Sequence, residues 1–152
     1  MKLTVEAPPQ GYPYRRRITT RWTDNDVYGH VNNAVYYHYF DSVINALLIE
    51  QGGLDIHDGQ TVGFIVRSEC DYLKPVAYPA ELEVGLAVER LGNSSVTYAM
   101  ALFEVSASGH TEEVTQACAR GRMVHVFVDT ASGRPTPIPG RMRQALSAYR
   151  VK

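Results

Sequence analysis

One segment constrains the fold of this 152-residue chain more than any other, the run AVYYHYFDSVINALLIEQGG at residues 34–53. Its apolar residues recur with a helical period, and its polar residues fall on one narrow stripe made of His38, Asp41, Ser42 and Asn45. Asn32 or Asn33 is suited to cap the start of this helix, and two glycines end it. A helix that is apolar over most of its circumference must be surrounded, most simply by a curved sheet.

The flanking segments predict the strands of that sheet. Residues 15–22 are rich in β-branched side chains, and after the helix the hydrophobic period falls to two. The later strands are expected at residues 61–75, 80–92, 96–107 and 111–129, the last with a bend or bulge at Gly121, and a short helix at 141–150. We therefore expect one α+β domain over residues 1–152. It should be a curved antiparallel sheet of about five strands wrapped around one long central helix.

The charge balance excludes some partners. With 15 basic and 16 acidic residues, the chain has no general attraction for nucleic acid or an anionic membrane, and Arg15, Arg16 and Arg17 cannot share one face of a strand.

No apolar stretch approaches the roughly 18 residues of a membrane span, and no signal peptide begins the chain. Two cysteines without a Cys-x-x-Cys pair indicate free thiols, which favours the cytoplasm. Long apolar strands predict pairing with a second subunit.

The chemistry is concentrated in DNDVYGHVNN, residues 24–33, directly before the helix. A calcium loop would match Asp-x-Asp-x-x-Gly, but its fifth position is Tyr28 and its twelfth is Val35. A transition-metal site is a second interpretation, although the helix offers no Glu-x-x-His or His-x-x-x-His partner; its ligands would be Asp24, Asp26 and His30. A third is that these side chains only cap turns and the start of the helix.

The fourth interpretation is catalytic. The first turn of a helix presents unpaired backbone N–H groups and the positive end of the helix dipole, which can polarise a carbonyl and stabilise an oxyanion. A carboxylate beside them can act as a nucleophile or as a general base for water. Such a site transfers an acyl group without a metal or a serine nucleophile, and the sequence contains no Gly-x-Ser-x-Gly motif.

The pattern Asp-x-Asp-x-x-Gly-His-Val-Asn-Asn-x-x-Tyr, here Asp24 to Tyr36, resembles the hot-dog-fold acyl-CoA thioesterases of the hydroxybenzoyl-CoA thioesterase type. The segments SECDYLKPVAYPAELEV (68–84) and GRMVHVFVDTASGRPTPIP (121–139) are also similar, so the likeness covers nearly the whole chain. The resemblance implies a hot-dog fold and the hydrolysis of an acyl-CoA thioester to a free acid and coenzyme A. It further implies no cofactor or metal, and a homodimer or homotetramer with active sites between subunits.

The resemblance also assigns roles to residues. The second aspartate of the family's motif is the catalytic carboxylate, here Asp26, and the polarising N–H belongs to the first helical residues, here around Asn33. His30 and Asn32 match the signature and would order the loop or contact the acyl group, and Asp24 would shape the turn. Tyr36 and Ser68 are candidates for the acyl pocket. Coenzyme A phosphates call for polar and basic side chains, for which the candidates are Lys74, Arg90, Ser94, Ser95, Arg120 and Arg122.

Two other functions stay open. One is a hot-dog dehydratase or hydratase acting on acyl thioesters, which would use a histidine and a carboxylate on or near the helix. The other is a non-catalytic acyl-CoA binding protein, which would be expected to carry a further regulatory segment. The sequence does not specify the acyl chain, nor whether Asp26 acts as nucleophile or base.

Overall fold

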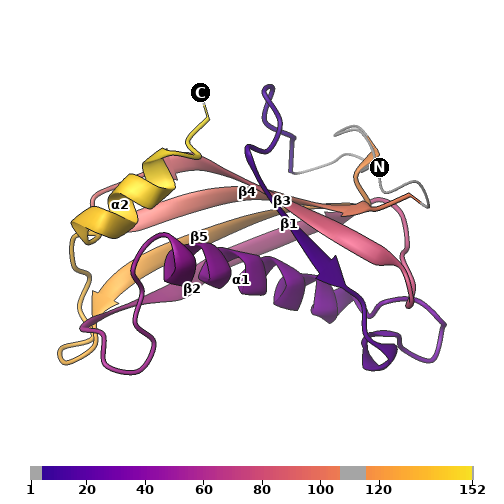
Figure 1. Ribbon diagram of the computed structural model, residues 1–152, viewed down its shortest axis with the longest axis horizontal. Coiled ribbons are helices and arrows are strands. Elements are labelled where there is room, and N and C mark those ends of the chain that lie inside the picture. The colour runs from indigo at the N-terminus through magenta and orange to yellow at the C-terminus, as the bar shows by residue number, and fades with distance from the viewer. Residues whose placement is uncertain (1–4, 107–115, 152) are drawn as a thin grey trace.

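One face of a five-stranded antiparallel sheet holds a long helix in this computed structural model, which describes residues 5–106 and 116–151 (Figure 1). The strands stand in the order β1-β3-β4-β5-β2, each antiparallel to its neighbour. The elements in chain order are β1 (Tyr14–Thr19), η1 (Trp22–Asp24), α1 (Asn33–Glu50), β2 (Thr61–Tyr72), β3 (Glu81–Leu91), β4 (Ser95–Glu104), β5 (Ala119–Asp129) and α2 (Gly140–Ser147). The parts of two predicted strands at residues 107 and 111–115 lie outside the described residues.

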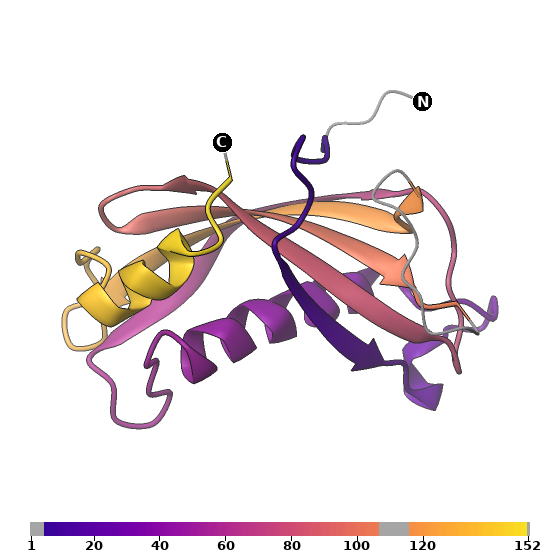
Figure 2. The same ribbon diagram turned by 45° about the horizontal axis from the view of Figure 1, so that its top comes forward.

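Helix α1 packs along the inside of the curved sheet (Figure 2). It is capped by Asn32, whose Oδ1 accepts a hydrogen bond from the backbone N–H of Ala34 at 2.9 Å. The predicted polar stripe faces solvent at His38, Asp41 and Ser42. The buried face of the helix consists of Tyr36, Tyr39, Phe40, Val43, Ile44, Leu47 and Leu48, which enter one core with the inner side chains of the sheet. The predicted α+β architecture, a sheet curled around a helix, is confirmed.

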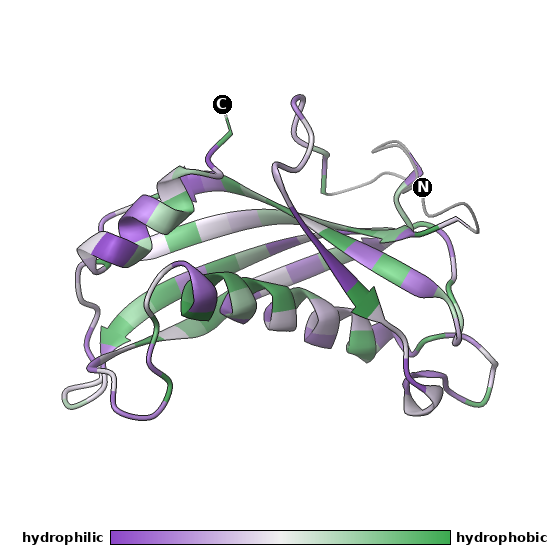
Figure 3. Ribbon diagram, in the orientation of Figure 1, coloured by the Kyte–Doolittle hydropathy of each residue, from purple (hydrophilic) through white to green (hydrophobic). Residues whose placement is uncertain are grey.

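The two edges of the sheet differ in chemistry. β1 is short, and its three arginines form ion pairs on alternate faces, Arg15 and Arg17 with Glu83 and Arg16 with Glu50. The prediction that these arginines do not share one face is therefore confirmed. β2, at the other edge, exposes Phe64, Ile65 and Val66. Figure 3 shows that β1 is hydrophilic over most of its length.

Within residues 5–106 and 116–151, no helix is both long enough and apolar enough to cross a membrane. The longest apolar helix, α1, is instead covered by the sheet on one side and carries its polar stripe on the other.

Gly121 lies in the regular part of β5, opposite Cys70 on β2 and Met100 on β4, with no shift in register. The predicted bend or bulge at this glycine is therefore wrong. The reason for the glycine is close packing, because a Cβ at this position would lie 2.7 Å from Cε2 of Phe40 on α1. The register shifts occur elsewhere, between Ile65 and Arg67 and between Val88 and Arg90.

Replacing Gly121 by alanine should lower the free energy of unfolding by about 1–3 kcal/mol, because one methyl group is forced into a filled core. Gly140→Ala is the matched control, since a Cβ there meets nothing within 4 Å. Urea unfolding of both variants checks this. Equal stability of the two would mean that Phe40 moves freely and that packing does not require the glycine.

Candidate active site

The polar loop before α1 folds back on itself. The backbone N–H of Asp26 donates to the carbonyl of His30 at 2.9 Å, and the N–H of Gly29 donates to the carbonyl of Asp26 at 3.0 Å. Gly29 has a φ of 86°, in the left-handed region that a residue with a Cβ rarely adopts. The turn therefore depends on this glycine. It holds the side chain of Asp26 beside the first turn of α1.

Asp24 anchors this loop to the helix. Its side chain is only 1% exposed, and its Oδ2 accepts hydrogen bonds from the Tyr39 hydroxyl at 2.6 Å and the Arg21 backbone N–H at 2.9 Å. Its Oδ1 accepts from the Arg21 guanidinium. Burial acts to raise the pKa of Asp24, but these hydrogen bonds and the charge of Arg21 outweigh it and hold the pKa below its usual value. Both oxygens are already engaged, which disfavours Asp24 as a metal ligand.

The carboxylate of Asp26 is connected to the helix cap. Its Oδ1 accepts from the Tyr28 backbone N–H at 2.9 Å, and its Oδ2 accepts from Nδ2 of Asn32 at 3.4 Å. The same Asn32 side chain caps Ala34 through its oxygen. One asparagine thus holds the carboxylate and the start of the helix in a fixed relation.

The first turn of α1 leaves one donor available. The N–H of Ala34 is bonded to the Asn32 side chain, and the N–H of Val35 to the Asn32 carbonyl at 2.9 Å. Within the residues that the structure describes, no acceptor is bonded to the N–H of Asn33. This N–H carries the positive end of the helix dipole and is the natural donor for a carbonyl oxygen.

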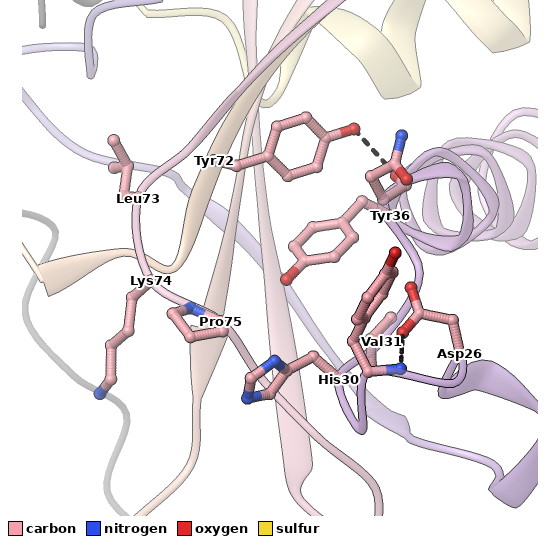
Figure 4. Close-up of a pocket in the computed structure, with 10 residues that line it drawn as sticks. Asp26, His30, Val31, Tyr36, Tyr72, Leu73, Lys74 and Pro75 are labelled. Atoms are coloured by element: carbon pink, nitrogen blue, oxygen red, sulfur yellow. Dashed lines mark hydrogen bonds between the residues drawn. The ribbon is translucent and has the colours of Figure 1, made fainter.

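A cavity of about 380 Å³ unites these groups (Figure 4). Its walls come from the polar loop, the start of α1 and the segment that follows β2, and its lining residues are Asp26, Tyr28, His30, Val31, Asn33, Tyr36, Tyr72, Leu73, Lys74 and Pro75. The predicted residues Asp26, His30, Asn33, Tyr36 and Lys74 therefore share one cavity. Burial raises the pKa of Tyr36 to about 12, so this phenol stays protonated and can donate a hydrogen bond.

Tyr72 is a site residue that sequence reasoning missed. Its hydroxyl donates to the backbone carbonyl of Asn33 at 2.8 Å, and its ring meets Tyr36 edge-on with centroids 5.0 Å apart. It thereby ties the end of β2 to the first turn of α1. The sequence places Tyr72 near the end of the strand predicted at residues 61–75. It contains no pattern that would pair Tyr72 with Asn33.

Other predicted substrate contacts lie away from Asp26 within one chain. Ser68 lines a different cavity beside α1. Arg90 lies nine residues after Glu81, the first residue of β3, which corresponds to about 30 Å along the strand. The turn that contains Ser94 and Ser95 is bonded to α2, which lies at the end of the molecule opposite the start of α1 (Figure 1).

Arg120 and Arg122 project from the face of the sheet opposite α1, since they alternate with core residues on β5. Arg122 is paired with Glu69 and with Glu89, both at 3.2 Å. The Nε of Arg120 is buried without a hydrogen-bond partner. The role of both arginines in substrate binding stays a prediction.

Within residues 5–106 and 116–151, no three or more His, Cys, Asp and Glu side chains lie together so that they could hold a metal ion. The cavity presents a carboxylate, a helix N–H and aromatic walls.

Comparison with known proteins gives consistent matches. A model of the family described as the thioesterase-like superfamily matches residues 20–146. The PA5185 protein of Pseudomonas aeruginosa strain PAO1 is 50% identical, with a TM-score of 0.87, over 96% of this chain and 97% of that one. The PA2801 protein of Pseudomonas aeruginosa is 34% identical, with a TM-score of 0.76, over 89% and 98%. A thioesterase from Thermus thermophilus, solved in complex with coenzyme A and zinc, is 31% identical, with a TM-score of 0.68, over 90% and 98%.

Asp24→Asn should destabilise the protein by about 1–3 kcal/mol near neutral pH, because a buried, fully bonded carboxylate is lost. The folded-state pKa of Asp24 is lowered, so its contribution is complete above the unfolded value of about 4 and is lost as the pH falls through the folded value. The stability gap to wild type should therefore narrow in acid.

Urea unfolding at about pH 7 and about pH 3 measures that gap. Asp58→Asn, on an exposed loop, is the matched control and should show little change at either pH. A gap of the same size at both values would contradict the role given to the Asp24 charge.

Proposed function

Because the chain belongs to the thioesterase-like superfamily, we propose that it hydrolyses an acyl-CoA thioester to a free acid and coenzyme A. The observation that carries the proposal is the link through Asn32, which bonds the Asp26 carboxylate and caps the helix that offers the Asn33 N–H. A carboxylate and an oxyanion donor in one cavity are what acyl transfer without a metal requires.

In this mechanism the thioester carbonyl oxygen accepts a hydrogen bond from the Asn33 N–H, which stabilises the negative charge that develops on it. Asp26 then attacks the carbonyl carbon, expels the thiolate and leaves a mixed anhydride that water hydrolyses, or it takes a proton from the attacking water. A single turnover in heavy-oxygen water tests the first route. Label in the Asp26 carboxylate indicates attack by Asp26, because it enters there only through hydrolysis of the anhydride at the aspartyl carbon.

Two observations support coenzyme A as the leaving group. The Thermus thermophilus thioesterase was solved with coenzyme A, and in this chain Lys74 lines the cavity, where an ammonium can meet a phosphate. The more distant candidates would have to reach the site from a neighbouring subunit; they are Arg90, Ser94, Ser95, Arg120 and Arg122.

A homo-oligomer with active sites between subunits is part of the proposal. The exposed apolar residues Phe64, Ile65 and Val66 lie on an open strand edge, which favours pairing with β2 of a second copy. β2 ends at Tyr72 in the cavity wall, so a neighbouring copy on this edge would also border the site. A measurement of the mass in solution distinguishes such a dimer from a tetramer built of two dimers.

The cytoplasm is the compartment we propose for this activity. Cys70 and Cys118 are both free thiols, which is the usual state in a reducing compartment.

Val66→Lys should convert the protein to a smaller species and lower its activity, because a charged ammonium would have to lose its hydration at the apolar edge where two copies meet. Light scattering coupled to size exclusion measures the mass. Ile49→Lys, at another exposed apolar position near the end of α1, is the control and should leave the mass unchanged. A wild-type monomer would contradict the proposed interface.

Asp26→Asn should reduce thiol release from acyl-CoA esters by about 100-fold or more while the fold persists, because an amide neither attacks nor accepts the proton. The assay is thiol release from a panel of aliphatic and aromatic esters, with Asp58→Asn as control.

The same panel separates the rival functions. Binding of the esters without thiol release by wild type would favour the binding protein. Hydration of an enoyl-CoA without thiol release would favour the hydratase. An Asp26→Asn variant as active as wild type would exclude the role given to this carboxylate.

A further inference from the structure

Two peptide groups meet at Asn33, the residue whose N–H is the proposed oxyanion donor. The first joins Asn32 to Asn33, and its carbonyl oxygen accepts a hydrogen bond from the N–H of Val35 at 2.9 Å. The second joins Asn33 to Ala34. Its N–H donates to Oδ1 of Asn32 at 2.9 Å, and its carbonyl oxygen accepts from the Tyr72 hydroxyl at 2.8 Å. Within the described ranges, only the Asn33 N–H of these two groups is left for a ligand.

Among the bonding partners described for these groups, Tyr72 alone lies outside residues 32–35. The bonds to Val35 and Asn32 close the first turn of α1 on itself, so they move together with that turn. The bond from Tyr72 comes from the end of β2 and fixes the turn relative to the sheet. Because a peptide group is planar, holding both its C=O and its N–H also fixes its orientation.

Core packing does not hold this turn. Asn33 and Ala34 are both exposed, and the buried face of α1 begins only at Tyr36. Helix ends that lack packing tend to fray. The position of the Asn33 N–H therefore depends on hydrogen bonds, and the bond from Tyr72 is the one that relates it to the rest of the cavity.

Tyr72 also begins the wall of the cavity that faces the donor. Tyr72, Leu73 and Lys74 line that cavity in succession (Figure 4). The backbone N–H groups of Leu73 and Lys74 donate to the carbonyl of Cys118 at 2.9 and 3.0 Å, which holds the wall against the sheet. The Tyr72 hydroxyl thus joins two parts of the site that belong to different elements, namely this wall and the open N–H at the start of α1.

The Tyr72 hydroxyl is suited to hold its partner and not to react. Burial raises its pKa, and Cys70 acts in the same direction, so the phenol stays protonated near neutral pH. Its hydrogen is directed at the Asn33 carbonyl, so another acceptor could take it only by breaking that bond. Its ring meets Tyr36 edge-on with centroids 5.0 Å apart, a contact that a phenylalanine would keep.

We propose, on the basis of the function proposed above, that Tyr72 is a positioning residue that holds the Asn33 N–H at the right distance from the thioester carbonyl. The negative charge on the carbonyl oxygen is larger in the transition state than in the bound ester. Misplacing the donor therefore slows the chemical step more than it weakens binding. The hydroxyl of Tyr72 contributes to kcat, while the ring contributes to the shape of the cavity.

The first test compares Tyr72→Phe with Tyr149→Phe in thiol release from the ester panel. Tyr149 also loses a hydroxyl hydrogen bond, 2.9 Å long and directed to Gln51, but it follows α2 and does not line the cavity. Tyr72→Phe should lower kcat about tenfold and change KM by less than about twofold. Tyr149→Phe should leave both constants unchanged.

A spectroscopic test reports on the donor without turnover. The Asp26→Asn protein is saturated with octanoyl-CoA or benzoyl-CoA labelled with carbon-13 at the thioester carbonyl, and the carbonyl band is recorded by difference infrared spectroscopy. A hydrogen bond lowers this stretching frequency, so the bound ester should absorb below the free ester. Adding Tyr72→Phe should move the band at least halfway back toward the frequency of the free ester. Adding Tyr149→Phe should leave it in place.

An unchanged kcat in Tyr72→Phe, a loss confined to KM, or a carbonyl band that does not respond to the substitution would overturn the inference. The failure of the proposed function is a different result, namely no thiol release by wild type from any ester. In that case a band shift in Asp26→Asn that Tyr72→Phe removes would still support the positioning role. Thermal denaturation of each variant is measured first, and all assays run well below the lowest midpoint, so that a loss of stability does not imitate a loss of position.

Discussion

The candidate site depends on the buried hydrogen bond between the Tyr39 hydroxyl and the Asp24 carboxylate. Tyr39 lies on the second turn of α1, and Asp24 lies at the end of η1, so this bond fixes both ends of the loop between them. Asp26 and Asn32 belong to that loop. The hydrogen bond between their side chains can persist only while the loop keeps its position against the helix. An uncharged, solvated Asp24 would leave the Asp26 carboxylate without a defined relation to the Asn33 N–H.

The apolar circumference of α1 has a second consequence. Because the sheet must cover most of the helix, polar groups on α1 are confined to its start and to one stripe. The start carries Asn33, and the stripe carries His38 and Asp41. Asn33 therefore lies where the helix is open to solvent, beside the polar loop and the segment that follows β2.

The sequence predicted the architecture because helical and strand periods are local properties, and it predicted the loop because Asp26 and Asn33 are close along the chain. It missed Tyr72, whose contact with Asn33 depends on the register of β2 and not on local pattern. It misjudged Gly121, because periodicity does not show which side chain packs across a strand. The distant polar candidates could not be placed either, since their type does not tell which end or face of the sheet they occupy; these are Arg90, Ser94, Ser95, Arg120 and Arg122.

The unequal edges of the sheet limit how the molecule can grow. A strand edge that is open on both sides of a sheet allows copy after copy to add, as in a fibril. Here β1 carries ion-paired arginines, and only β2 is apolar and open among the edges described. Two copies joined through β2 would leave charged edges at both ends, so the association terminates itself. In such a dimer the ion-paired arginines of β1 would keep the outer edges from pairing with further copies.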